Sequence, residues 1–493
     1  MKGVTLPAPG KRTMSPKKLG VVNGLGRQVA PDLYCKLKRG FADAGAALQI
    51  LPELQVLLDP TPNGDQPMAL SDDGRVKTRK LDVFAACRSF AAKGADAILL
   101  PCFSSHVFRE ELQAELDVPL LDLMDALHRH VASTVKRGSL LGVLTSTFAA
   151  TAQLFERTFG ADYALVYPSA ACQQALMQTL YGAGGVGDGA ALRAIDTACR
   201  DLRRQGAAAL LPGFAELALA APALQRDGID LPDINAIYAD YALRFDGHRK
   251  PVPFRLGVVG GVGPAATIDF MGKVISNTHA VRDQDHIRMV VDHNPQIPDR
   301  TANLLHHDAD PTVALFASCK RLEADGAQAI AIPCNTAHAY VEHMQPHLQV
   351  PIVNMLDETM YHVREHYGVT KTVGLLATAG TVASRVYHAA AERESIRLIA
   401  PTPEFQDKVT SAIYGRHGIK AGFTRGRCRE ELLSAVAHLA ELGAEVLILG
   451  CTELPLVLPP TDRFEIKGRL VALVDPTTVL AQRCVQLADS YNQ

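Results

Sequence analysis

The 493-residue sequence lacks a strong excess of charge of either sign, with 50 Lys and Arg against 52 Asp and Glu and a formal net charge of −2. Nucleic-acid-binding proteins usually carry a basic surface, which this composition does not require, so we expect no nucleic-acid partner. The sequence also lacks an apolar stretch that approaches the roughly 20 residues needed to span a bilayer. We therefore expect no membrane association.

A secretory leader is missing as well, because the opening "MKGVTLPAPGKRTMSPKK" has no apolar segment of the kind that signal peptides carry. We predict that residues 1–18 form a flexible basic tail. The ten cysteines show no regular disulfide spacing, which indicates a reducing compartment where thiols stay free. We therefore expect a cytoplasmic protein.

Metal-binding motifs are also lacking, since neither Cys-x-x-Cys nor HExxH accompanies the histidine pair in "LLHHDADPT". His306, His307 and Asp308 are adjacent, and adjacent side chains on a helix or strand point apart. We predict a solvated helix end there, and no metal site.

What the sequence does contain is an internal repeat, the feature that decides the domain organisation. "KLGVVNGLGRQVAPDLY" is echoed by "RLGVVGGVGPAATIDFM", with Leu19 matching Leu256, and "GADAILLPCFSSHVF" by "GAQAIAIPCNTAHAY". Two further pairs follow in the same order, "DVPLLDLMDAL" with "QVPIVNMLDET" and "GAAALLPGFAELAL" with "GAEVLILGCTELPL". The polar, proline-bearing stretch "RFDGHRKPVPF" separates the copies and fits a linker. We predict one domain over residues 19–247 and a second over residues 248–493.

Each half alternates short β-branched runs with segments of helical length. The second half contains the runs "LGVVG", "IRMVVD", "AIAIP", "VPIVN", "TVGLLA" and "EVLILG", and helical-length segments such as "PTVALFASCKRLEADG". Continuous apolar strands separated by helices predict an α/β fold with a parallel sheet covered on both faces. In such sheets, ligands bind beyond the carboxyl ends of the strands.

Two cysteines stand where predicted strands end. Cys334 follows the run in "AIAIPCNTAHAY", and Cys451 follows the run in "GAEVLILGCTELPLVL". One cysteine in such a place is usually an inert packing residue. Two of them at strand ends could flank one substrate.

With these motifs in this order, the second half resembles the aspartate/glutamate racemase family over nearly all of residues 255–460. The shared motifs are a Gly-rich first turn, an Asp-Arg after the second strand, and the strand ends Cys-Asn-Thr and Gly-Cys-Thr-Glu. The resemblance implies two tandem racemase-like domains, each of two pseudo-symmetric lobes with a parallel sheet flanked by helices. It also implies an isomerase that works without pyridoxal phosphate, metal or nucleotide on a small amino acid.

In that family one cysteine from each lobe faces the α-carbon of the substrate from opposite sides, and the matching residues here are Cys334 and Cys451. Racemisation removes a proton from one face and returns one to the other, which a thiolate and a thiol can do. A free cysteine has a pKa of roughly 8.5, so the thiolate needs hydrogen-bond donors, a helix N-terminus or a cation nearby. Asn335, Thr336 and Thr452 could supply such donors.

Two cations match substrate-binding positions of the family, Arg300 in "PQIPDRTANLL" and Lys420 in "YGRHGIKAG". The guanidinium fork of arginine suits a carboxylate. Two cations suggest a substrate with two carboxylates, aspartate or glutamate, although broad-specificity amino-acid racemases share these motifs. The resemblance implies a substrate-binding set of seven residues, Gly261, Arg300, Asn335, Thr336, Thr378, Lys420 and Thr452.

Two other classes of protein remain as alternatives. "GVVGGVGPAAT" contains the G-x-G-x-x-A form of a dinucleotide fingerprint after a predicted strand, with Asp292 as the nearest acidic residue at a later strand end, which would suit an NAD-dependent oxidoreductase. In the aspartate/glutamate racemase family, methionine commonly stands at the position that Val262 has in this same loop. The second alternative is a non-catalytic sensor that binds an amino acid.

Two residues beside the cysteines have open roles. His338 would either hydrogen-bond near the Cys334 thiol or be a satisfied histidine on a helix face. Glu453 would either orient the Cys451 thiol or the substrate amino group, or be an acid at a helix start.

The first half departs from the pattern. Cys102 matches Cys334, but Phe214 stands where Cys451 does, Gly187 replaces Lys420, and no Asp-Arg-Thr turn follows the second strand. Phenylalanine cannot exchange a proton, so we predict an inactive copy, with a one-sided reaction at Cys102 as the alternative. We expect this copy to provide a partner surface as an internal pseudo-dimer, and a homo-oligomer is possible.

Overall fold

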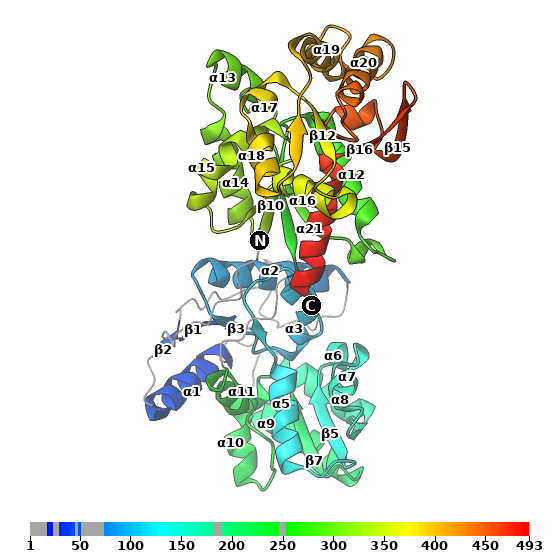
Figure 1. Ribbon diagram of the computed structural model, residues 1–493. Helices are drawn as coiled ribbons and strands as arrows, with labels where there is room; N and C mark the ends of the chain where they lie inside the picture. Colours follow the sequence, from blue (N-terminus) through cyan, green and yellow to red (C-terminus); the bar gives the residue numbers. More distant parts are fainter. Residues whose placement is uncertain are drawn as a thin grey trace. The chain divides into compact units, whose positions relative to one another are not determined.

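The computed structural model describes residues 17–22, 29–44, 48–50, 73–181, 189–245 and 253–492 (Figure 1). The chain divides into two compact units, an N-terminal unit that ends at Val252 and a C-terminal unit that begins at Pro253. Residues 1–16 of the predicted tail lie outside the described residues, and Lys17 already begins the first strand. The predicted boundary at residues 247 and 248 also lies outside the described residues. That boundary and the internal pseudo-dimer stay predictions.

The first lobe of the C-terminal unit is a four-stranded parallel sheet in the order β11-β10-β8-β9. Helices α12 and α21 pack on one face, through a core that includes Val258 and Leu480, and α14 packs on the other, through Val259 and Leu322. The elements before the second lobe are β8 (Arg255–Gly260), α12 (Pro264–Asn277), η1 (Asp283–Asp285), β9 (Arg288–His293), α13 (Arg300–His306), α14 (Thr312–Ala324), β10 (Ala329–Ala331), η2 (Thr336–Tyr340), α15 (Val341–Met344), η3 (Gln345–His347), β11 (Ile352–Val353) and α16 (Met355–Tyr367).

The second lobe is a five-stranded sheet in the order β13-β12-β14-β16-β15. Strands β13, β12, β14 and β16 are parallel, and β15 joins β16 as an antiparallel hairpin, which departs from the all-parallel sheet expected from the sequence. The elements are β12 (Thr372–Ala377), α17 (Ala379–Ala383), α18 (Val386–Arg393), β13 (Arg397–Ile399), α19 (Pro403–Tyr414), η4 (Ile419–Ala421), α20 (Arg427–Glu441), β14 (Val446–Gly450), η5 (Leu454–Leu456), β15 (Thr461–Ile466), β16 (Arg469–Val474) and α21 (Pro476–Asn492).

The N-terminal unit also contains two parallel sheets, in the orders β2-β1-β3-β4 and β6-β5-β7. Its elements are β1 (Lys17–Val21), α1 (Val29–Ala44), β2 (Leu48–Ile50), α2 (Asp73–Ala92), β3 (Ala97–Leu99), α3 (Phe103–His106), α4 (Arg109–Ala114), β4 (Leu120–Leu121), α5 (Leu123–Thr134), β5 (Leu140–Thr145), α6 (Thr147–Thr151), α7 (Leu154–Phe159), β6 (Ala164–Val166), α8 (Ala170–Leu180), α9 (Gly189–Arg204), β7 (Ala209–Gly213), α10 (Leu217–Arg226) and α11 (Ile234–Leu243).

The same strand order recurs in all four sheets. In each, the first strand of the lobe lies between the second and the third. Each first strand also contains a glycine against which a helix packs: a Cβ added at Gly257 would lie 3.1 Å from the Cβ of Leu322, and one at Gly142 would lie 2.9 Å from that of Leu202. The predicted α/β fold with two lobes in each half is therefore confirmed.

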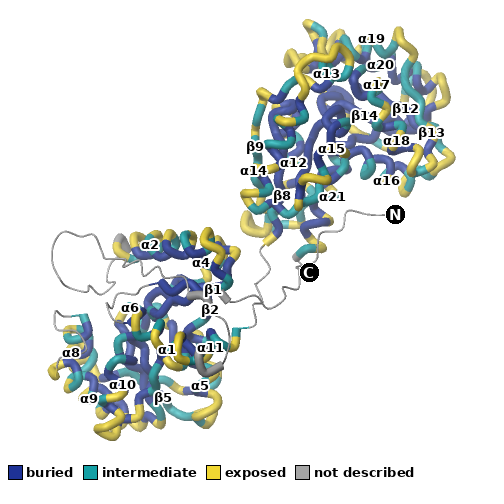
Figure 2. The backbone as a smooth tube through the Cα atoms, turned by 90° about the vertical axis from the view of Figure 1, so that its left-hand side faces the viewer, coloured by how far each residue is buried: buried dark blue, intermediate teal, exposed yellow. Residues whose placement is uncertain are grey.

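The central strands are buried because their runs are apolar on both faces. In Figure 2 strands β8 and β14 of the C-terminal unit are dark blue, while exposed residues gather on outer helices. Each fully buried Val or Leu side chain contributes roughly 1.5–3 kcal/mol. Helix α21 contacts both α12 and α16, and Figure 1 shows these three helices side by side. The last helix of the chain thus holds the two lobes of this unit together.

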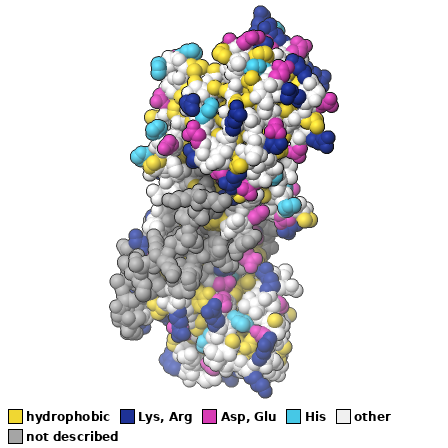
Figure 3. Space-filling view, viewed as in Figure 1, with side chains coloured by type: hydrophobic (Ala, Val, Ile, Leu, Met, Phe, Trp, Pro, Cys, Tyr) yellow, Lys and Arg dark blue, Asp and Glu magenta, His cyan; other side chains and the backbone are white. Residues whose placement is uncertain are grey.

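The surface of the C-terminal unit is mixed in charge. On the face in Figure 3, Lys and Arg side chains are interspersed with Asp and Glu over the described residues. No helix within the described ranges combines the length and the apolar character that crossing a bilayer requires.

Candidate active site

A solvent-open pocket of about 290 Å³ lies in the C-terminal unit, beyond the carboxyl ends of β8, β10, β12 and β14. Parallel strands of both lobes end there, which is where ligands bind in open α/β sheets. The lining residues are Val262, Arg300, Thr301, Cys334, Asn335, Thr336, Thr378, Tyr414, Lys420, Cys451, Thr452 and Glu453.

All but one of the residues expected to meet the substrate line this pocket. The exception is Gly261, which has a φ of +85° and lies behind the lining. Its amide donates a hydrogen bond to the Thr267 hydroxyl over 3.1 Å, and a Cβ there would meet the backbone of Asn294 and Pro295. Gly261 therefore shapes the loop after β8, because only glycine fits this close approach at positive φ.

Cys334 lies just past β10, where the chain turns into η2. It is 7% exposed, and its backbone N–H donates to the Ile332 carbonyl over 2.7 Å. His338 lies behind it: Nδ1 hydrogen-bonds the Cys334 carbonyl oxygen at 2.9 Å, and Nε2 accepts from the Met355 N–H at 3.0 Å. Burial lowers the pKa of His338, so the imidazole is neutral. Its two hydrogen bonds are with backbone groups, so it stabilises the turn and does not bond the Cys334 thiol.

Arg300 begins α13 after Asp299, whose carboxylate accepts from the Ala302 N–H and caps the helix. Its guanidinium is 8% exposed and donates to three backbone carbonyls, those of Val262 at 2.8 Å, Pro298 at 3.0 Å and Ile297 at 3.3 Å. Burial alone would lower the pKa of Arg300, but the neighbouring Cys334 and Asp299 raise it. The cation thus lies beside the Cys334 sulfur as well as at the pocket wall.

Cys451, Glu453 and Lys420 form a connected set at the opposite strand end. The Cys451 thiol donates to Glu453 Oε2 over 3.0 Å, and Lys420 Nζ lies 2.8 Å from Oε1. Burial, and next the Glu453 carboxylate, raise the pKa of Cys451 well above its usual value, while Lys420 opposes this. Burial would also raise the pKa of Glu453, but Lys420 holds it below its usual value. The arrangement keeps Cys451 a protonated thiol beside a carboxylate.

Threonine hydroxyls join the two lobes at the pocket wall. Thr336 Oγ1 lies 2.7 Å from Thr381 Oγ1 and 3.2 Å from Thr378 Oγ1. Thr378 caps α17 by accepting from the Thr381 N–H, while the Asn335 amide oxygen accepts from the Tyr387 hydroxyl. Because each hydroxyl can donate or accept, this network can turn donors toward a carboxylate.

The sequence analysis did not identify Tyr414 as a residue of the pocket, or the Thr301 hydroxyl as its hydrogen-bond partner. Burial raises the pKa of Tyr414 to about 12, so its hydroxyl stays protonated and donates to Thr301 Oγ1 over 3.3 Å. Lys420 Nζ lies 5.5 Å from the centroid of the Tyr414 ring. The sequence did contain a signal for Tyr414, because a tyrosine opens the matching stretch in both copies: Tyr181 in "YGAGGVGDG" and Tyr414 in "YGRHGIKAG".

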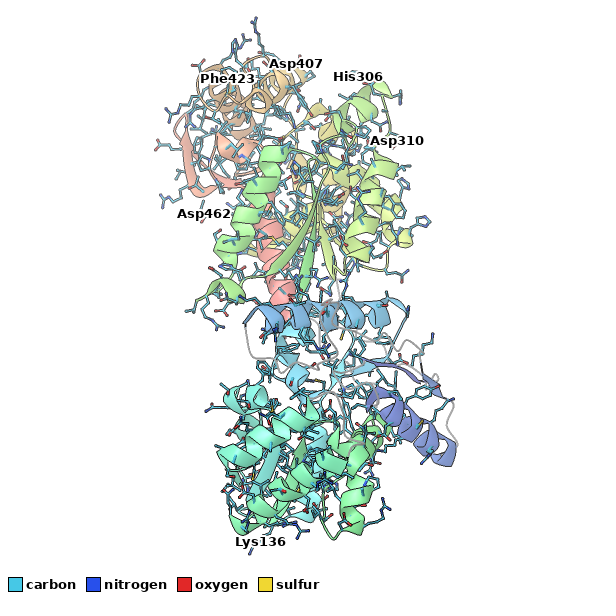
Figure 4. All side chains as sticks on the ribbon, turned by 180° about the vertical axis from the view of Figure 1, so that it is seen from behind. Lys136, His306, Asp310, Asp407, Phe423 and Asp462 are labelled. Atoms are coloured by element: carbon cyan, nitrogen blue, oxygen red, sulfur yellow. The ribbon has the colours of Figure 1, made fainter. Side chains whose placement is uncertain are left out.

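Two other motifs are not part of the pocket. His306 ends α13 at the periphery of the unit (Figure 4), and no group of three or more His, Cys, Asp or Glu that could hold a metal ion occurs among the residues described here. Asp292 pairs with Arg321 at 2.8 Å. A Cβ at Gly263 would lie 3.0 Å from Glu453 Oε1, so a carboxylate adjoins the loop where a dinucleotide would place its pyrophosphate.

The N-terminal unit has only part of this constellation. Cys102 follows β3 and Phe214 follows β7, and both line one pocket, so a thiol there faces an aromatic ring. Gly187, at the position of Lys420, lies outside the described residues.

Several known proteins that are similar to this chain are racemases. A model of the Asp/Glu/hydantoin racemase family matches residues 40–242 and again residues 259–484. The broad specificity amino-acid racemase RacX of Bacillus subtilis (strain 168) is 27% identical over 240 residues, which cover 48% of this chain and 99% of RacX. A glutamate racemase of Ectopseudomonas mendocina (strain ymp) is 33% identical over 176 residues, 34% of this chain and 61% of that protein.

Among solved structures, the Picrophilus torridus aspartate racemase is 29% identical, with a TM-score of 0.41 over 48% of this chain and 98% of that one. Because the family model matches twice, the predicted tandem arrangement is confirmed, as is the predicted enzyme class, an isomerase. The chain belongs to the Asp/Glu/hydantoin racemase family.

Proposed function

We propose that the C-terminal unit racemises an acidic amino acid, aspartate or glutamate, by proton transfer between Cys334 and Cys451. The observation that carries this proposal is that both cysteines line one pocket between the strand ends of two lobes. Two acid–base groups on one pocket supply what racemisation needs, a base at one face of the α-carbon and an acid at the other.

The two sulfurs differ in charge surroundings, which supports a resting state with one thiolate and one thiol. A thiolate at Cys334 would face the Arg300 guanidinium, while Cys451 donates its proton toward Glu453. In one direction Cys334 takes the α-proton, and the electron pair of the broken C–H bond stays on the substrate. The Cys451 thiol then gives its proton to the opposite face, which leaves Cys334 as thiol and Cys451 as thiolate. The reverse reaction starts from that state, with Lys420 near the new thiolate.

The carboxylates of the substrate would meet Arg300, the threonine hydroxyls and the start of η2. Asn335, Thr336 and Thr452 line the pocket next to the two cysteines, so their polar groups can hold the α-carboxylate. Holding the α-carboxylate in this way fixes the position of the α-carbon relative to both sulfurs, and such positioning accelerates the reaction.

The test is exchange of the α-hydrogen in deuterated water, followed by NMR on single enantiomers of aspartate, glutamate, asparagine, glutamine and alanine. Aspartate or glutamate should exchange and lose optical activity together. Binding without exchange would indicate the amino-acid sensor. A shift in melting temperature with NAD, but none with amino acids, would indicate the oxidoreductase.

A second candidate is a broad-specificity amino-acid racemase. It is favoured because Lys420 and Arg300 already interact with groups of the protein itself. Lys420 is already paired with Glu453, and Arg300 donates to three backbone carbonyls. Both charges are therefore partly used by the protein itself. Exchange of asparagine or alanine at a rate within about 10-fold of that of aspartate, a free-energy difference under about 1.4 kcal/mol, would favour this candidate.

A further inference from the structure

The N-terminal unit contains a pocket of its own, open to solvent, at the carboxyl ends of β3 and β7. Its wall combines a thiol, a carboxyl group, three aromatic rings and two hydroxyls. The lining residues are Val29, Pro101, Cys102, Phe103, Ser104, Tyr181, Gly213, Phe214, Ala215 and Glu216.

Glu216 is the acid of this pocket, and it lacks the cation that its counterpart has. It matches Glu453, which is paired with Lys420 at 2.8 Å, but the sequence has Gly187 at the position of that lysine. Among the described lining residues of the pocket there is no Lys, Arg or His beside the Glu216 carboxylate. Burial raises the pKa of Glu216. Among the described residues that line the pocket, this acid therefore has no compensating cation.

Aromatic side chains adjoin this acid. The Phe214 ring is 3% exposed and packs edge-on against Tyr181, with 6.0 Å between centroids. Ser146 and Ser104 lie close enough to the Tyr181 hydroxyl to oppose the rise in its pKa that burial causes. Aromatic faces and a carboxylate are the groups that recognise an ammonium ion, and Phe214 adds apolar surface.

We propose that this pocket binds a small organic ammonium compound, whose cation pairs with Glu216 and whose apolar part contacts Phe214 and Tyr181. The described lining residues include no Lys, Arg or His, so a carboxylate ligand would meet Glu216 without a compensating charge. The ligand class is thus the reverse of the acidic amino acids proposed for the C-terminal unit. This inference stands on the N-terminal unit alone and does not depend on racemase activity in the other.

The experiment is isothermal titration calorimetry of the full chain with benzylamine, and with benzoate and benzyl alcohol as probes of similar shape. Benzylamine should bind, whereas benzoate should not, and benzyl alcohol should bind at least about 10-fold more weakly, since it lacks the positive charge that pairs with Glu216. Glu216→Gln should abolish benzylamine binding. Glu110→Gln, which removes an exposed acid of α4 from the same unit, should leave it unchanged.

Alkylation by iodoacetamide locates the bound probe. Benzylamine should slow the reaction of Cys102 in the pocket but not that of Cys35, which is exposed, as read by peptide mass spectrometry. Circular dichroism checks that Glu216→Gln is folded. The proposal is wrong if benzylamine fails to bind, if Glu216→Gln binds it as tightly as the unchanged chain, or if Cys102 gains no protection.

Discussion

The Cys451 thiol donates a hydrogen bond to the Glu453 carboxylate over 3.0 Å, two residues along the same strand end. Lys420 holds the other carboxylate oxygen at 2.8 Å. One catalytic candidate therefore lies between an anion that favours its thiol form and a cation that favours its thiolate form. Burial, and then the balance of these two charges, set the pH at which Cys451 loses its proton.

The titration of Cys451 should move in opposite directions in two variants. Glu453→Gln removes a carboxylate that, next to burial, raises the pKa of Cys451, so this pKa should fall. Lys420→Met removes the opposing cation, so the pKa should rise. The measurement is the rate of Cys451 alkylation against pH, in a Cys334→Ala background. A shift in the same direction for both variants would contradict this electrostatic account.

Substitution of Cys334 or Cys451 should slow α-hydrogen exchange, whereas substitution of Cys102 should not. Cys334→Ala and Cys451→Ala should each reduce α-hydrogen exchange of aspartate by at least about 100-fold, because each removes a general acid–base group. Cys102→Ala should leave the exchange rate unchanged, since Phe214 deprives that pocket of a second proton carrier. Exchange is measured by NMR in deuterated water. Equal losses in all three variants would overturn the assignment of racemisation to the C-terminal unit.

Arg300→Lys should cost both stability and activity. A lysine cannot reach the three backbone carbonyls that the guanidinium bonds, so about 1–3 kcal/mol of local stability should be lost. Hydrogen–deuterium exchange of the loop after β8 should speed up as a result. Arg282→Lys, at an exposed arginine paired with Asp285, is the matched control and should leave exchange in that loop unchanged.

Substitution by alanine should have opposite effects on stability at two glycines, Gly261 in the loop after β8 and Gly272 in α12. Gly261→Ala places a Cβ against the backbone of Asn294 and Pro295 at a φ of +85°, and should destabilise the C-terminal unit by more than about 1 kcal/mol. Gly272→Ala, in the exposed interior of α12, meets no atom within 4 Å and should stabilise it by about 0.5–1 kcal/mol. Thermal unfolding of both variants checks this. A loss of stability in Gly272→Ala would contradict the argument.

Much of the site followed from the repeat and from strand-end motifs. Cys334, Cys451, Thr378 and Val262 each follow a strand of the C-terminal unit, and parallel strands bring their carboxyl ends to one edge, so neighbours around the pocket could be expected. Tyr414 was not found, because it ends a helix far along the chain and reaches the pocket only when α19 packs on the second sheet. Strand β15 was missed because its exposed, charged residues resemble those of a loop, and the apolar, mostly buried run of β16 was overlooked.

The architecture could be predicted from the amino-acid sequence, since apolar runs of strand length, glycines beneath packed helices and the doubled order of motifs leave few folds open. The electrostatics of the pocket, in contrast, depend on contacts that form when the chain folds. Arg300 binds backbone carbonyls and adjoins Cys334, while Lys420 and Glu453 neutralise each other beside Cys451. Each of these contacts joins residues from different loops of one lobe, and interactions between charges depend on distance and burial, which the order of residues along a chain does not specify.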